Sequence, residues 1–70
     1  MRYRDLAKRL KHLGCEELRH GKGSHRVWFN PNTNQITTVP DWGKKDLAPG
    51  TVRAIIRELG IGREEFGPLV

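Results

Sequence analysis

A lysine, a serine and a histidine stand together in the stretch Lys22-Gly23-Ser24-His25, directly after Gly21. Histidine titrates near neutral pH, so its ring can give or take a proton there. The two glycines can adopt positive φ and expose backbone N–H groups, which, with the lysine at the tip, would bind an anion. The stretch therefore predicts either an ordinary tight turn or a turn that holds a phosphate beside His25.

Two other chemistries fit these residues less well. Cys15, His20 and His25 lack the paired spacing that is typical of zinc ligands. Ser24 directly precedes His25, and neighbours on a strand point to opposite faces, so the two do not by themselves form a nucleophile–base pair. Ser24 is expected to bond the backbone of the turn or to touch a phosphate.

RNA carries its own nucleophile, the 2′-hydroxyl, so a ribonuclease needs a proton-transfer group and a cation for the phosphorane charge. His25 could supply the first. The candidate cations are Lys22, Arg26, Lys44 and Lys45. The alternative for His25 is structural: it caps the strand or packs under a helix.

Hydrophobic periodicity predicts the elements that position these residues. Leu6, Leu10 and Leu13 recur with helical spacing, which predicts a helix over about 3–13 that ends at Gly14. Strands are expected at 24–29, where Val27, Trp28 and Phe29 favour a strand, and at 35–39, where Pro40 stops it, and turn-forming residues separate the two. The pattern of residues 15–20 is weak, and a short strand is expected there because no helix can restart so soon after Gly14.

A second helix is expected from Pro49, with Val52, Ile55, Ile56 and Leu59 on its apolar face and Gly60 at its end. One short helical turn at 62–66 would place Phe66 in the core. The order predicts an α+β fold, α-β-β-β-α, with two helices on one face of a three-stranded antiparallel sheet.

The length of 70 residues allows a single domain, residues 1–70, with a thin core and little room for a deep cofactor cavity. We therefore expect a surface site, or one shared with a partner chain, and no cofactor. The lone Cys15 cannot form an internal disulfide, and neither a membrane span nor a signal peptide is expected, which favours the cytoplasm.

The positive charge is concentrated at one end of the sequence. Residues 1–26 carry eight basic and three acidic residues, whereas residues 27–70 carry five of each. Arg4, Lys8 and Lys11 form a stripe along the first helix. A concentrated positive field attracts polyanions, and nucleic acid is the leading candidate. A solubilising surface is the alternative.

Several motifs together resemble one family. The Lys22-Gly23-Ser24-His25 motif follows a helix that ends in glycine, and Thr38-Val39-Pro40 ends the last strand. Gly50-Thr51-Val52-Arg53 then leads into Ile55-Ile56-Arg57, followed by Gly60-Ile61 and by Glu65-Phe66. In order and spacing, nearly the whole chain is similar to the HicA toxins, the mRNA interferases of HicA–HicB toxin–antitoxin pairs.

The resemblance implies a fold like that of double-stranded RNA-binding domains and ribonuclease activity on mRNA, with the histidine of the motif, here His25, as catalytic residue. It also implies a HicB-like antitoxin that masks the site. The chain departs from the family pattern at Trp42, where many members have histidine, and at Cys15, where a bulky apolar residue is common. Whether His20 substitutes for the missing histidine stays open.

Three hypotheses follow. The first is a metal-independent endoribonuclease toxin in which His25 transfers protons, Ser24 and the Gly23 backbone position the phosphate, and Lys22 and Arg26 supply charge. RNA would also be held by Arg4, Lys8, Lys11, Lys44 and Lys45. The second is a non-catalytic RNA-binding module. The third is a protein-interaction domain whose basic face docks an acidic partner, which an exposed Trp28 or Trp42 would support.

Overall fold

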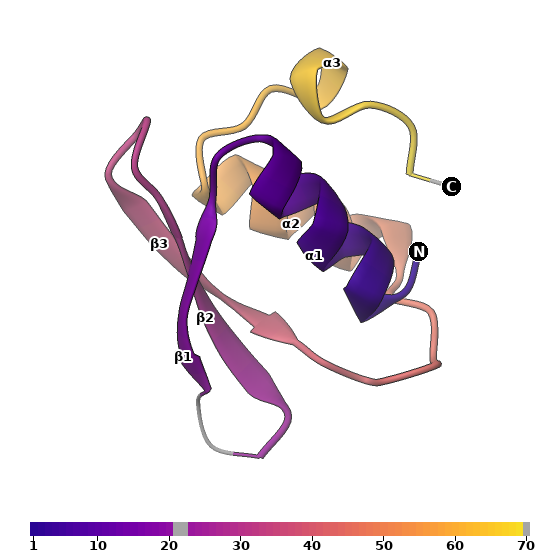
Figure 1. The fold of residues 1–70 in the computed structure, drawn as a ribbon. Helices are drawn as coiled ribbons and strands as arrows, with labels where there is room; N and C mark the ends of the chain where they lie inside the picture. The colour runs from indigo at the N-terminus through magenta and orange to yellow at the C-terminus, as the bar shows by residue number, and fades with distance from the viewer. Residues whose placement is uncertain (21–22, 70) are drawn as a thin grey trace.

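A computed structural model describes residues 1–20 and 23–69 of the chain. The elements follow the order α1 (Tyr3–His12), β1 (Glu16–His20), β2 (His25–Asn30), β3 (Gln35–Pro40), α2 (Pro49–Glu58) and α3 (Arg63–Phe66). The three strands form one antiparallel sheet in the order β1-β2-β3, and α1 and α2 cover one face of it (Figure 1). The predicted α+β fold and its element order are thus confirmed.

Local sequence signals explain where the elements end. The left-handed φ of Gly14, +92°, lets the chain leave α1 and enter β1, and Gly60, at φ +71°, does the same after α2. Pro49 occupies the first turn of α2, where a missing N–H costs nothing. Pro40 is the last residue of β3, as expected for a residue that cannot continue the hydrogen-bond ladder.

The core lies between the helices and the sheet. Leu6 and Leu10 of α1, Val52 and Ile56 of α2, and Trp28 of β2 are all at most 2% exposed. Phe66 of α3 is also buried and closes the core from the C-terminal side, as its position after the second helix predicted. Burial of these side chains is the main source of stability in so small a domain.

In the part of the chain that the structure describes, no helix covers the second face of the sheet (Figure 1). Trp28 is buried under the helices, so the strand alternation places Val27 and Phe29 on the other face, where they are only half-buried. Ile36 of β3 pairs with Phe29 and is 56% exposed. Among the described residues, no helix is long and apolar enough to cross a membrane.

Candidate functional site

His25 is the first residue of β2, the central strand, and its side chain is exposed. It lies three residues before the buried Trp28, so it belongs to the open face of the sheet, with Val27 and Phe29. Its backbone pairs with Pro40 of β3. His25 therefore does not pack under a helix, and a fixed strand presents it to solvent.

The residues just before His25 are exposed as well. Gly23 has φ +62°, and a Cβ built on it would meet no atom within 4 Å, so its backbone is open to a ligand. The carbonyl oxygen of Ser24 accepts a hydrogen bond from the N–H of Asp41 at 2.6 Å. This bond holds the start of β2 against the segment that follows β3. Lys22 and the side chain of His20 lie outside the described residues.

The segment after β3 forms a tight turn beside Ser24 and His25. The Asp41 Oδ1 atom accepts a hydrogen bond from the Gly43 N–H at 3.0 Å, and the Lys45 N–H donates to the Trp42 carbonyl at 3.1 Å. Gly43 has φ +62°, which suits a glycine at this point of the turn. The turn exposes Lys44, Lys45 and Trp42, the last with 48% of its surface in solvent.

Arg26 and Asp41 tie this turn to the sheet. The Arg26 Nη2 and Nε atoms donate to Asp41 Oδ2 at 3.0 and 3.3 Å, and both side chains are about three-quarters buried. The N–H of Gly43, followed by the Arg26 guanidinium, holds the pKa of the Asp41 carboxyl below its usual value, while partial burial opposes the shift. The sequence analysis missed Asp41, although the spacing Asp41-Trp42-Gly43 is a turn signal.

A second hydrogen bond supports the same strand from beneath. The Trp28 Nε1–H donates to the Tyr3 hydroxyl at 3.1 Å and so joins β2 to the first turn of α1. Burial is the main cause that raises the pKa of Tyr3, and the carboxylates of Glu17 and Asp41 add to it. Trp28 is fully buried, so of the two tryptophans only Trp42 is exposed.

The predicted basic stripe lies on a different part of the molecule. Arg4, Lys8 and Lys11 are exposed on α1, in the helical layer, whereas His25 belongs to the opposite face of the sheet. The turn that carries Lys44 and Lys45 is hydrogen-bonded to the start of β2 through Asp41 and Ser24. The residue after this turn, Asp46, pairs with Arg2 at the start of α1.

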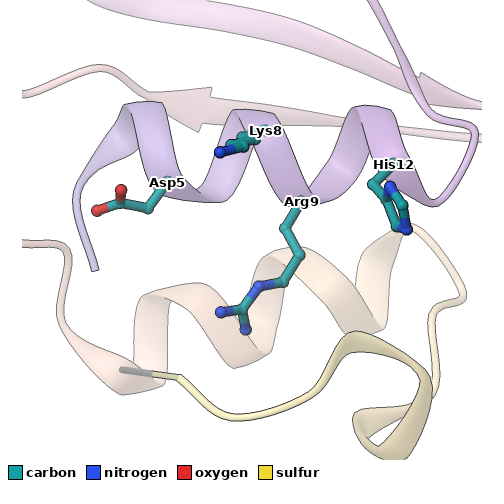
Figure 2. Close-up of a pocket in the computed structure, with 4 residues that line it drawn as sticks. All are labelled: Asp5, Lys8, Arg9 and His12. Atoms are coloured by element: carbon teal, nitrogen blue, oxygen red, sulfur yellow. The ribbon is translucent and has the colours of Figure 1, made fainter.

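Arg9 of α1 is directed at the C-terminal segment. Its guanidinium lies 4.9 Å from the centre of the Phe66 ring and donates hydrogen bonds to the carbonyls of Phe66 and Pro68. Figure 2 shows Arg9 reaching away from α1 toward this segment, beside Asp5, Lys8 and His12, which line a shallow hollow. The charge of Arg9 is therefore used to hold the C-terminal segment on α1.

Fold and site together define a small α+β domain that presents an exposed histidine beside a lysine-rich turn. The chain belongs to the HicA toxins of bacterial toxin–antitoxin systems, whose family pattern it matches over residues 3–61. The matched range includes the predicted site residues from Arg4 to Lys45. A relative from Pseudomonas fluorescens (strain Pf0-1), named "Probable mRNA interferase HicA", is 37% identical over 62 residues, which cover 87% of this chain and 97% of the relative. No solved structure matches the chain significantly.

Proposed function

We propose that this HicA toxin is a metal-independent endoribonuclease that cleaves mRNA, with His25 as its proton-transfer residue. The observation that carries the proposal is the position of His25: exposed, fixed at the start of the central strand, and next to the turn that presents Lys44 and Lys45. The name of the Pseudomonas relative supports RNA as the substrate. A HicB-like antitoxin in the same cytoplasm would neutralise the activity.

The reaction needs few groups from the protein. The imidazole of His25 takes the proton from a 2′-hydroxyl, the freed oxygen attacks the adjacent phosphorus, and the bond from phosphorus to the 5′-oxygen breaks. The products are a 2′,3′-cyclic phosphate and a 5′-oxyanion, which takes a proton from the imidazolium of His25 or from water and becomes a 5′-hydroxyl. Because the RNA supplies the nucleophile, neither a metal-activated water nor a protein nucleophile is required.

The charge that develops on the phosphate oxygens needs stabilisation. The exposed Lys44 and Lys45 lie on the turn held against Ser24, so we assign them this role, together with Lys22 of the glycine turn. The open backbone at Gly23 and the Ser24 hydroxyl would position the phosphate. Arg26 is paired with Asp41, so we propose that it acts through the turn rather than on RNA.

The α1 cations would serve a different purpose. Arg4, Lys8 and Lys11 are separated from His25 by the sheet, so their contribution is attraction and binding of RNA at some distance from the scissile bond. Their removal should weaken RNA binding and its salt dependence but leave the rate of cleavage at saturating RNA nearly unchanged.

The decisive experiment measures cleavage of a defined RNA in excess EDTA by the wild type, by His25→Ala and by His12→Ala. His12 is an exposed histidine on α1 and provides the matched control. We expect His12→Ala to cut like the wild type and His25→Ala to lose roughly 10²- to 10⁴-fold in rate, the usual share of general acid–base catalysis. Circular dichroism would verify that both variants fold.

Other results would reject parts of the proposal. Wild-type activity in His25→Ala would remove His25 from the proton-transfer role, and a requirement for added metal would reject the metal-independent reaction. If no variant cuts but all bind RNA with the same affinity, the domain is a binding module.

A further inference from the structure

A groove on the far side of the molecule from His25 is not used by the proposed reaction. It lies between α2 and α3, with a volume of about 630 Å³, and is lined by Arg53, Ile56, Arg57, Gly60, Ile61, Gly62 and Arg63. A smaller hollow of about 230 Å³ shares Arg53, Ile56 and Arg63 and extends it along Pro68 and Leu69. In Figure 1, α3 and the start of β2 lie at opposite ends of the molecule.

Three arginines surround this groove. Arg53 and Arg57 are one turn apart on α2, Arg63 begins α3, and all three are exposed. None of them forms an ion pair with another residue of the described ranges 1–20 and 23–69. Glu58, the acidic neighbour of Arg57, instead accepts a hydrogen bond from the Thr37 hydroxyl. The groove therefore carries three positive charges that no carboxylate of the described residues pairs with.

The chemistry of the lining narrows the class of ligand. Guanidinium groups form paired hydrogen bonds with carboxylates, and Arg clusters recognise acidic segments in this way. The base of the groove is formed by Ile56 and Ile61 and by glycines that leave it open, which suits apolar side chains. None of the described residues that line the groove is aromatic, so it lacks the aromatic platforms on which single-stranded nucleic acids usually stack.

We propose that this groove binds a peptide segment of a partner protein that carries both acidic and apolar residues. The carboxylates would pair with Arg53, Arg57 and Arg63, and the apolar side chains would enter the hollow above Ile56 and Ile61. The proposal does not depend on RNA cleavage, because none of these residues belongs to the site around His25.

Gly62 makes the groove accessible to a steric test. Its φ of −71° and ψ of 148° suit any residue, and a Cβ built on it would meet no atom within 4 Å. The substitution Gly62→Gln should therefore fill the groove without straining the backbone and without changing the charge.

The probe is a random peptide library displayed on phage and selected on the immobilised full chain. We expect enrichment of peptides rich in Asp or Glu and in Leu, Ile or Phe. The best synthetic peptide should bind the variant R53Q/R57Q/R63Q at least ~10-fold more weakly than the wild type, since each lost ion pair contributes a few-fold. It should also bind Gly62→Gln more weakly.

A matched variant, R4Q/K8Q/K11Q, loses the same net charge from α1 and should keep the affinity for the peptide within ~3-fold. The groove variants should cleave RNA like the wild type. No enrichment of acidic peptides, equal binding by R53Q/R57Q/R63Q, or an equal loss in R4Q/K8Q/K11Q would each overturn the proposal. A loss of RNA binding confined to the groove variant would make the groove an RNA surface and would overturn it too.

Discussion

Breaking the ion pair between Arg26 and Asp41 should both destabilise the domain and impair RNA cleavage. The pair joins β2 to the turn that carries Lys44 and Lys45, through N···O distances of 3.0 and 3.3 Å. Asp41→Asn is the cleanest change, because the remaining amide oxygen can still accept the hydrogen bond from Gly43. Arg26→Gln removes the charge of the other partner and keeps part of its stem.

The expected size follows from burial. The side chains are 24% and 22% exposed, so the pair lies between a solvent-exposed one, worth about 0.2–1 kcal/mol, and a fully buried one, whose disruption costs about 3–5 kcal/mol. We expect each single variant to lose about 1–2 kcal/mol in the free energy of unfolding. In a domain of this size, 1 kcal/mol lowers Tm by about 4–8 °C.

Urea unfolding followed by tryptophan fluorescence would measure the loss, since Trp28 is buried and becomes exposed. The double variant R26Q/D41N should be little worse than either single variant, which gives a coupling energy of about 1–2 kcal/mol. We expect cleavage to fall about 10-fold in kcat/KM in both single variants, which corresponds to about 1.4 kcal/mol, because the phosphate contacts proposed for Lys44 and Lys45 depend on the position of the turn.

Two results would refute this reasoning. A coupling energy near zero would mean that the two side chains do not stabilise each other in solution. A large loss of cleavage in Arg26→Gln with none in Asp41→Asn would show that Arg26 acts on the RNA itself, not through the turn.

Three further predictions concern pH and the core. The pKa of Asp41 is lowered in the folded state, so the ionised carboxylate stabilises the fold fully above the pKa of Asp41 in the unfolded chain. This stabilisation is lost as the pH falls through the pKa of the folded state. The difference in free energy of unfolding between wild type and Asp41→Asn, measured by urea titrations, should therefore close in acid. Tyr3→Phe should leave the buried Trp28 indole N–H without its acceptor and lower the free energy of unfolding by about 1–3 kcal/mol, as measured by thermal or urea unfolding. His12→Ala, a change at an exposed residue of the same helix, is the control and should have little effect. Burial, followed by the charge of Glu65, raises the pKa of the Cys15 thiol, so its reaction with a disulfide reagent at neutral pH should be slow and should accelerate with urea; rapid reaction in the native protein would contradict this.

Periodicity and turn chemistry were sufficient to predict the element order. The apolar spacing of Leu6 and Leu10 marked α1, and the positive-φ positions of Gly14 and Gly60 fell where glycine had been expected to end each helix. The helical turn that buries Phe66 was likewise confirmed. These features depend on residues close together in the sequence, so local preferences decide them.

The partners of the charged residues could not be predicted in the same way. Arg26 pairs with Asp41 and Arg9 with the carbonyls of Phe66 and Pro68, although each arginine had several possible partners in the sequence. Such choices depend on the register of β2 and β3 and on how the C-terminal segment crosses α1. The position of His25 on the open face, by contrast, follows from strand alternation once Trp28 is taken as buried.

The central position of β2 has a consequence for how such toxins diversify. His25 is the first residue of β2, a strand that is paired on both sides. His25 itself lies opposite Pro40 of β3, and the next residue, Arg26, lies opposite His20 of β1. Its Cα position is therefore held by the pairing of β2 with β3. Under the proposed function, a substitution in either turn would change the charge offered to a phosphate, while the residue proposed to perform the chemistry would keep its place.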